Sequence, residues 1–272
     1  MIKFSVAMSV YKNDKPSFLD KALESITDLQ TVKPDEICLV VDGPISNDLD
    51  DVIEKYVAKY NFRTMRLAQN MGLGYALKIA TENASYEIIA RMDSDDIASP
   101  TRFEEQLYML ESNPQIDIVG GNITEFVGEE SNIVARRSVP TSNDEIRIYM
   151  KTRCAMNNVS VMFKKSEIMS AGGYQDWFWN EDYFLWIRMW LNGAVFANTG
   201  TDLVNVRTGS DMYARRGGIK YFNSEKGLQK YMLQHKMISP VTYCMNITKR
   251  FIVQCVLPNS LRGWVFRKLA RR

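Results

Sequence analysis

The 272-residue sequence lacks the features of a secreted, membrane-spanning or zinc-binding protein. Its four cysteines are scattered with no CxxC pair, which argues against a disulfide scaffold or a zinc-ligand spacing and predicts reduced structural thiols. The N-terminus has neither the length nor the cleavage site of a signal peptide. The longest apolar run near the end, residues 251–257, is far shorter than the ~20 residues that span a bilayer. A cytoplasmic protein is therefore expected.

Acidic residues are absent from the last part of the chain. No Asp or Glu follows Glu225, whereas ten Lys and Arg residues do, so residues 226–272 carry +10. With a net charge of +2 overall, the rest of the chain carries −8. A basic tail on an acidic body indicates a polyanionic surface as partner. Because the basic residues are confined to one end, a membrane surface is favoured over nucleic acid.

With 46% hydrophobic residues, the chain has the composition of a globular protein with a sizeable core. Residues 2–10, 36–41 and 86–92 are near-continuous apolar runs, typical of parallel strands buried on both faces. Segments with apolar residues at helical spacing lie between and after these runs. Strand and helix therefore alternate through about residue 115, which predicts an open α/β sheet. Ligands of such sheets bind at the carboxyl ends of the strands.

The second half has a different pattern. After Pro114, short strand candidates alternate with helical segments, one of which is expected over residues 180–191. The strand candidates are 116–119, 122–127, 159–163 and 194–197. From about Gly218 the sequence is helical and basic, with breaks expected at Pro240 and Pro258. We therefore expect one domain over residues 1–216, with halves 1–115 and 116–216, and a basic helical extension over 217–272.

Three carboxylates follow the third apolar run. Asp93, Asp95 and Asp96 stand between a buried strand and a helix that starts after Pro100. Carboxylates at the end of a buried strand repel one another unless a cation or a hydrogen-bonded sugar separates them. Mg²⁺ and Mn²⁺ take one or two protein carboxylates plus phosphate oxygens, so Asp-x-Asp suits a metal–nucleotide complex. The alternative is a loop whose aspartates cap the next helix.

A second carboxylate pair, Glu181-Asp182, stands where the helix over 180–191 is expected to begin, among several aromatic residues. Aromatic neighbours desolvate a carboxylate and raise its pKa toward that of a useful general base, and aromatic faces stack on sugar rings. The alternative is that the pair only complements the helix dipole. Gly172 and Gly173, just upstream, predict a turn that could line the same cleft.

Two further segments are expected at strand ends. Asp42 closes the second strand before a Gly-Pro turn, and Asn70-x-Gly72-x-Gly74 opens a helix with glycines that let the backbone approach a ligand. The third glycine of a dinucleotide fingerprint is missing, which disfavours a Rossmann dehydrogenase. The absence of a Gly-Lys-Ser/Thr loop argues against a P-loop NTPase.

Taken in order, these segments resemble the family 2 inverting glycosyltransferases with a GT-A fold, especially bacterial enzymes that build capsule, lipopolysaccharide O-antigen or exopolysaccharide. The matching segments span about residues 4–216 and are 5–11, 41–43, 70–74, 92–96, 160–163, 172–174 and 181–182. The resemblance implies an open, mostly parallel sheet flanked by helices. It also implies a nucleotide-sugar donor, most often a UDP-sugar, and a Mn²⁺ or Mg²⁺ ion.

The resemblance further implies roles for individual residues. The donor side would comprise Val10 and Tyr11 at the base, Asp42 at the base edge, and Asn70, Gly72, Asp93 and Ser94. Asp95, with Asp93, would ligate the metal that bridges the diphosphate. Asp182 would be the catalytic base, and the acceptor side would comprise Glu181, Trp179, Gly172, Gly173 and Tyr174. Residues 207–218 are similar to the family's mobile loop, which would bring Arg215 or Arg216 to the diphosphate.

The sequence departs from the family pattern at two places. The second strand commonly ends in two aspartates, whereas here Val41 precedes the single Asp42. Asn157-Asn158 stands where many relatives carry a histidine, and the single histidine of this chain, His235, lies in the basic tail. These departures weaken the implied base contact of Asp42, and we expect His235 to be a surface or packing residue.

Segments 248–253 and 261–269 interleave aromatic and aliphatic residues with Arg and Lys, as interfacial helices do. If the acceptor is a polyprenyl-linked saccharide, such a helix would hold the protein at the inner face of the cytoplasmic membrane. The alternative is a helix that packs on the domain or across a homodimer.

Two other functions stay open at this point. One is a sugar nucleotidyltransferase, disfavoured because the region after Val10 lacks a glycine-rich loop with a basic residue. The other is a non-catalytic protein that binds a polyanion through its tail.

Overall fold

The computed structural model describes residues 2–209 and 217–257. The strands are β1 (Phe4–Val10), β2 (Glu36–Val41), β3 (Phe62–Arg66), β4 (Ile88–Arg91), β5 (Ile97–Ala98), β6 (Ile118–Phe126), β7 (Ile133–Arg137), β8 (Met162–Lys164) and β9 (Phe196–Arg207). The α-helices are α1 (Pro16–Ile26), α2 (Asn47–Val57), α3 (Leu73–Asn83), α4 (Arg102–Ser112), α5 (Asn143–Met150), α6 (Lys165–Ser170), α7 (Glu181–Leu191), α9 (Ile219–Gln234) and α10 (Pro240–Phe251). A 3₁₀ turn η1 (Asn158–Ser160) precedes β8, and a π-helical turn η2 (Ile252–Val256) continues α10.

The described strands form one sheet in the order β3-β2-β1-β4-β8-β6-β9-β5, and β7 pairs with β6. Strands β3, β2, β1 and β4 are parallel to one another. Strand β8 runs antiparallel to both β4 and β6, and β6 is again parallel to β9. The predicted α/β sheet flanked by helices is confirmed, with a parallel first half and a mixed second half.

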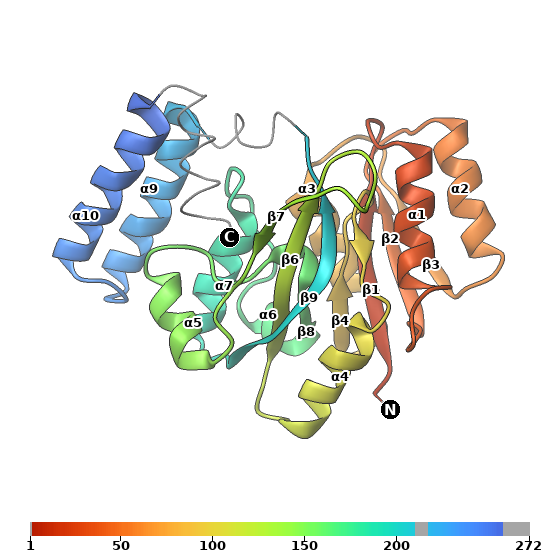
Figure 1. Cartoon of the computed structure of the whole chain (residues 1–272), viewed down its shortest axis with the longest axis horizontal. Coiled ribbons are helices and arrows are strands. Elements are labelled where there is room, and N and C mark those ends of the chain that lie inside the picture. The colour runs from red at the N-terminus through yellow and green to blue at the C-terminus, as the bar shows by residue number, and fades with distance from the viewer. Residues whose placement is uncertain (1, 210–216, 258–272) are drawn as a thin grey trace.

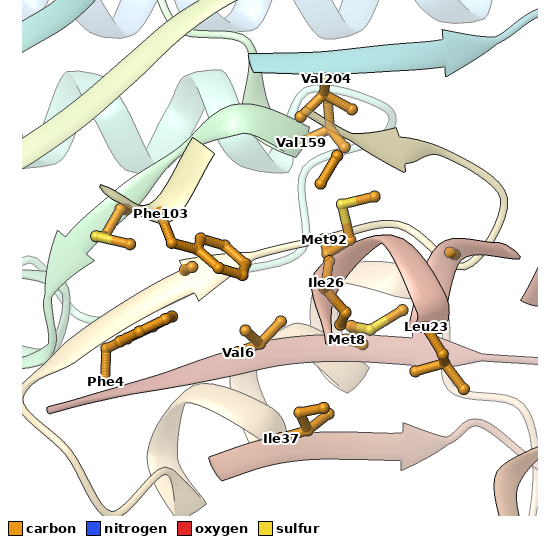
Figure 2. Close-up of a cluster of buried hydrophobic side chains, with 14 of the residues drawn as sticks. Phe4, Val6, Met8, Leu23, Ile26, Ile37, Met92, Phe103, Val159 and Val204 are labelled. Carbon is orange, nitrogen blue, oxygen red and sulfur yellow. The ribbon is translucent and has the colours of Figure 1, made fainter. Parts of the chain in front are cut away.

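Helices cover both faces of the sheet (Figure 1). Because side chains alternate along a strand, Phe4, Val6 and Met8 of β1 point to the face covered by α1, α2 and α4. Figure 2 shows these three residues packed with Ile26 of α1 and Phe103 of α4. The opposite face carries α3, α6 and α7. This double cover explains the continuous apolar runs in the sequence.

The predicted elements of the first half are confirmed with small shifts of their ends, and the strand over 36–41 is unchanged. The second half differs more. The two strands expected over 116–119 and 122–127 are the single strand β6, and the strand expected over 194–197 continues to Arg207 as β9. The strand expected over 159–163 is divided into η1 and β8. Strands β3, β5 and β7 had not been predicted.

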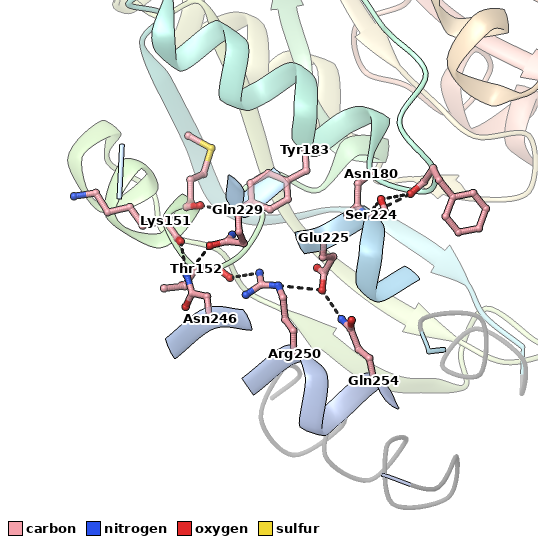
Figure 3. Close-up of polar contacts among 12 residues, drawn as sticks. Lys151, Thr152, Asn180, Tyr183, Ser224, Glu225, Gln229, Asn246, Arg250 and Gln254 are labelled. Carbon is pink, nitrogen blue, oxygen red and sulfur yellow. Dashed lines mark hydrogen bonds and ion pairs between the residues drawn. The ribbon is translucent and has the colours of Figure 1, made fainter. Parts of the chain in front are cut away.

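Helices α9 and α10 lie side by side at the end of the molecule opposite α1 and α2 (Figure 1). The expected break at Pro240 is confirmed, since Ser239 caps α10 there. Polar contacts attach the two helices to each other and to the body of the chain (Figure 3). They include Asn246 Nδ2 to Lys151 O (2.9 Å) and Gln229 Oε1 (2.8 Å), Arg250 Nη2 to Thr152 O (2.7 Å), and Trp177 Nε1 to Ser224 O (3.1 Å). Within the described ranges, no helix has the length and apolarity needed to cross a membrane.

Candidate active site

A cleft of about 1300 Å³ opens beside the ends of β4 and β9. Its walls come from the first turn of α3, the segment after β4, residues 174–183, and helices α9 and α10. It collects several of the residues expected from the sequence, namely Gly72, Asp93, Asp95, Tyr174, Trp179, Glu181 and Asp182. The cleft therefore lies where ligands bind in open α/β sheets.

The three carboxylates after β4 have different surroundings. Asp93 is paired with Arg91, whose Nη1 lies 2.6 Å from Asp93 Oδ2. Asp96 is buried, and its Oδ1 accepts a hydrogen bond from the backbone N–H of Arg207 at 2.8 Å. Asp95 lines the cleft, and burial raises its pKa to about 6, with the charges of Asp93 and Asp14 adding to the effect. A cation at Asp95 would relieve this cost of ionisation.

Asp93 and Asp95 fit a hard divalent cation that binds together with a diphosphate. Both offer only carboxylate oxygens, the ligands that Mg²⁺ and Mn²⁺ prefer. Across residues 2–209 and 217–257, no three His, Cys, Asp or Glu side chains are grouped to hold a metal. A cation at this position would therefore take its remaining ligands from phosphate and water, as Mg²⁺ does in many nucleotide sites.

Glu181 and Asp182 are the first two residues of α7 and face the same cleft. Burial, followed by the charge of Asp182, raises the pKa of Glu181 to about 7. Asp182 Oδ1 accepts a hydrogen bond from the backbone N–H of Tyr183 at 2.6 Å. The hydroxyl of buried Tyr174 is close enough to Arg91 and to both carboxylates for their charges to act on its pKa. Tyr174 thus lies within electrostatic range of both acidic segments, while its hydroxyl donates a hydrogen bond to Asn158 Oδ1 at 3.2 Å.

Asp42 is buried at the end of β2 and holds the loop that precedes α3. Its Oδ1 accepts from Met71 N at 2.6 Å, and its Oδ2 accepts from Gly72 N and Asn70 Nδ2, each at 2.9 Å. Gly43 lies against the same loop, because a Cβ on it would be 2.6 Å from the backbone N of Asn70. Both carboxylate oxygens thus bind the protein itself, and neither Asp42 nor Asn70 lines the cleft.

Val10, Tyr11 and Ser94 also lie outside the cleft lining. Val10 is buried at the end of β1, whereas Tyr11 is exposed. Asp14, which the sequence analysis missed, joins this turn to the Asp-x-Asp segment. Its Oδ2 accepts from Tyr11 N at 3.0 Å and from Ser94 Oγ at 2.8 Å. Its position just before the helix at Pro16 was the available signal.

The two glycines expected on the acceptor side form a helix C-cap. Gly172 and Gly173 both have positive φ, and their N–H groups donate to Met169 O and Ile168 O at the end of α6. The guanidinium of Arg188 binds Gly173 O at 2.7 Å. Neither glycine is among the residues that line the cleft, whereas the adjacent Tyr174 and Gln175 are.

Trp179 has an unusual backbone conformation. Its φ is +58°, a left-handed value that bulky residues rarely adopt, and its side chain is 47% exposed in the cleft. Its ring stacks on that of Phe178, with centroids 5.6 Å apart. A strained, half-exposed indole offers a flat apolar face to a sugar ring.

Comparison with known proteins agrees with this geometry. Residues 5–171 match the family model described as glycosyl transferase family 2. The chain belongs to this family. It is 37% identical over 270 residues to the UDP-Gal:alpha-D-GlcNAc-diphosphoundecaprenol beta-1,3-galactosyltransferase of Escherichia coli, covering 99% of this chain and 97% of that protein. It is 38% identical over 233 residues to the amylovoran biosynthesis glycosyltransferase AmsE of Erwinia amylovora, covering 86% of each.

The fold of this glycosyltransferase is shared with a solved structure. Residues 1–349 of TarS from S. aureus in complex with UDP-GlcNAc superpose with a TM-score of 0.69 at 14% sequence identity. The match covers 98% of this chain and 78% of that one. The GT-A fold expected from the resemblance is thus confirmed.

Several residues of the glycosyltransferase cleft were not expected from the sequence. They are mostly basic or come from the two C-terminal helices, and include Lys78, Arg137, Arg153, Tyr221, Glu225, Lys249 and Arg250. The tail beyond residue 217 therefore forms a wall of the cleft. Arg215 and Arg216 lie outside the described residues, as do the Pro258 break and segment 261–269. His235 ends α9, where its ring packs on Tyr231 away from the cleft lining.

Proposed function

We propose that this glycosyltransferase moves a sugar from a UDP-sugar to a hydroxyl of a lipid-linked saccharide during bacterial surface polysaccharide synthesis, with inversion at the anomeric carbon. The observation that carries the proposal is the convergence of Asp93 and Asp95 with Glu181 and Asp182 in one cleft. The names of the two curated relatives supply the UDP-sugar, the lipid diphosphate acceptor and the polysaccharide pathway. TarS, with its bound UDP-GlcNAc, supports a nucleotide-sugar donor in this fold.

Each pair of carboxylates has a separate task in the proposed reaction. Asp95 and Asp93 would hold a Mn²⁺ or Mg²⁺ ion, which when bound would neutralise the charge of the departing diphosphate. Asp182 removes the proton of the acceptor hydroxyl as its oxygen attacks the anomeric carbon. The bond to the diphosphate breaks, and its electron pair leaves with the nucleoside diphosphate. Attack opposite the leaving group in a single displacement inverts the anomeric configuration.

The neighbours of Asp182 assist it in different ways. Glu181 places a second charge beside the base only in its ionised fraction, because its raised pKa of about 7 keeps it partly protonated near neutral pH. Trp179 offers its ring to the acceptor sugar. Arg91 holds Asp93 in place through their ion pair.

The outward side of α10 and η2 supports the proposed location at the inner face of the cytoplasmic membrane. Val241, Met245, Ile252 and Val256 fall on one stripe of this continuous helix, and Val241 and Val256 are 69% and 60% exposed. No acidic residue follows Glu225, so the charge of this region suits anionic lipid. The opposite side of the same helix lines the cleft through Val253 and neighbouring residues. A membrane on the stripe would bring a lipid-linked acceptor within one helix diameter of the cleft.

Vesicle co-sedimentation tests this location. The full chain should bind vesicles that contain phosphatidylglycerol and not vesicles of phosphatidylcholine alone, and Val241→Ser with Val256→Ser should reduce the bound fraction several-fold. Exposed Ile148→Ser on α5 is the matched control. Equal binding by the stripe variant would refute the membrane contact, and a loss of dimer mass in that variant would assign the stripe to a homodimer.

The transfer reaction is tested with variants of the two pairs. Asp182→Asn should lower turnover by about 10²- to 10⁴-fold while UDP binding is retained. Asp95→Ala should lose metal-dependent UDP binding. Asp144→Asn, an acid in the first turn of α5, is the matched control for Asp182 and should keep wild-type turnover. Normal turnover by Asp182→Asn would refute its role as the base. If the protein instead joined a nucleoside triphosphate to a sugar phosphate and released pyrophosphate, it would be a nucleotidyltransferase.

A further inference from the structure

Four basic side chains line the same cleft as the Asp-x-Asp segment. Arg137 at the end of β7 donates from Nη2 to Cys154 O at 2.6 Å, and Arg250 of α10 donates from Nη2 to Thr152 O at 2.7 Å. The two guanidinium groups therefore bind the same short loop on either side of Arg153. Arg153 and Lys249 line the cleft with them. We call Arg137, Arg153, Lys249 and Arg250 the basic wall.

Much of the charge of the basic wall is not neutralised by the protein. Glu225 lies 3.1 Å from Arg250 Nε and offsets that charge. Arg137 contacts Cys154 through its carbonyl and its thiol and forms no ion pair with a carboxylate of the described residues, and its Nε is buried with no hydrogen-bond partner. Lys249 is exposed and has no carboxylate partner among residues 2–209 and 217–257. A partly buried guanidinium such as that of Arg137 is costly without an acid unless an anion binds it, and its planar donors match phosphate oxygens.

The basic wall lies next to the proposed catalytic base. The charges of Asp182 and Arg137 both act on the Cys154 thiol, so the base and the wall meet at this residue. Glu181, in contrast, feels the charge of Arg91, the ion-pair partner of Asp93 in the Asp-x-Asp segment. The donor diphosphate belongs with the cation at Asp95, so an anion on the basic wall would be a second one, bound near Asp182.

We infer that the basic wall binds the diphosphate of the acceptor, a saccharide carried on a lipid diphosphate. The inference rests on the proposed function and deepens it. The acceptor hydroxyl points to Asp182, the sugar ring crosses toward Trp179, and the reducing-end diphosphate meets Arg137, Arg153 and Lys249. The lipid then leaves the cleft past α10, whose outer stripe faces the proposed membrane.

Direct binding of an acceptor fragment tests the inference without transfer. Decyl diphosphate, titrated calorimetrically into the full chain in EDTA, should bind, whereas the neutral decyl maltoside should bind at least tenfold more weakly. Arg137→Gln and Arg153→Gln should each weaken decyl diphosphate binding at least tenfold, because each removes a charge-assisted contact. Lys249→Gln, at an exposed position, should weaken it several-fold. Arg136→Gln is the matched control, since this neighbouring arginine pairs with Asp202 outside the cleft.

The outcomes separate the inference from the proposed function. Unchanged binding by Arg153→Gln and Lys249→Gln, or equal binding of decyl diphosphate and decyl maltoside, would overturn the inference. In a transfer assay, the same variants should raise KM for a sugar on an alkyl diphosphate at least tenfold and leave KM for the same sugar on a neutral alkyl chain within twofold. Transfer to both acceptors with no such difference would refute the basic wall alone. Charge-selective binding without any transfer would refute the proposed function alone.

Discussion

Asp42→Asn distinguishes a residue that holds the glycine loop from one that touches the nucleotide. The carboxylate of Asp42 is 4% exposed and accepts hydrogen bonds from Met71 N, Gly72 N and Asn70 Nδ2. An asparagine keeps one oxygen and turns an NH₂ group toward donors on the other side. Whichever way the amide turns, at least one buried backbone N–H, that of Met71 or that of Gly72, faces the NH₂ group and loses its charge-assisted bond, which should lower the free energy of unfolding by about 2 to 3 kcal/mol.

The loss should appear in the absence of any nucleotide. Thermal unfolding followed by circular dichroism should show a Tm lower by about 5 to 10 °C, because about 2 to 4 °C is expected per kcal/mol in a chain of this size. Exposed Asp51→Asn on the adjacent helix α2 should change stability by less than about 0.5 kcal/mol. An Asp42→Asn protein with wild-type stability but weakened UDP binding would refute this reasoning and make Asp42 a nucleotide contact.

Two further predictions follow from the site and its loops. Because burial raises the pKa of Glu181 to about 7, above the ~4.3 of an unfolded chain, the folded state prefers the protonated form. The free energy of unfolding of the wild type should therefore fall relative to that of Glu181→Gln as the pH rises from about 4.5 to 7. In the transfer assay, kcat/KM should rise through pH 7 in the wild type but not in the variant. Gly43→Ala should lower the free energy of unfolding by about 2 kcal/mol or more in urea titration, since φ is +87° and a Cβ would lie 2.6 Å from Asn70 N. Gly128→Ala, with φ +72° but open space around it, should cost about 1 kcal/mol, and equal losses at the two positions would contradict the close approach at Gly43.

The sequence predicts the strands that are buried on both faces and misses those that are not. Strand β2 is fully buried along its length, so its apolar run marks its ends. Strand β3 carries only partly buried and exposed residues, and no apolar run reveals it. Gly120 and Gly121 were expected to end a strand, yet they lie within β6. A Cβ on Gly121 would be 2.5 Å from Leu203, so small residues are needed there for β9 to pack closely.

The same contrast applies to the cleft. Asp93, Asp95, Glu181 and Asp182 could be predicted because each pair follows a recognisable strand or begins a helix. The basic wall could not, since Arg137, Arg153 and Lys249 come from a strand end, a loop and a helix far apart in the sequence and have no characteristic spacing. For Asp42, the sequence indicates a buried carboxylate at a strand end but not that the following loop occupies it.

The most direct test of the account is whether UDP binds at Asp95 in a metal-dependent manner. The Tm of the full chain should be measured with UDP, GDP, CMP and ADP, each with and without Mn²⁺, for the wild type and for Asp95→Ala. The account predicts that UDP with Mn²⁺ raises the Tm of the wild type, that UDP alone does so much less, and that Asp95→Ala shows neither shift. No stabilisation of the wild type by any nucleotide, or an equal shift in Asp95→Ala, would contradict it.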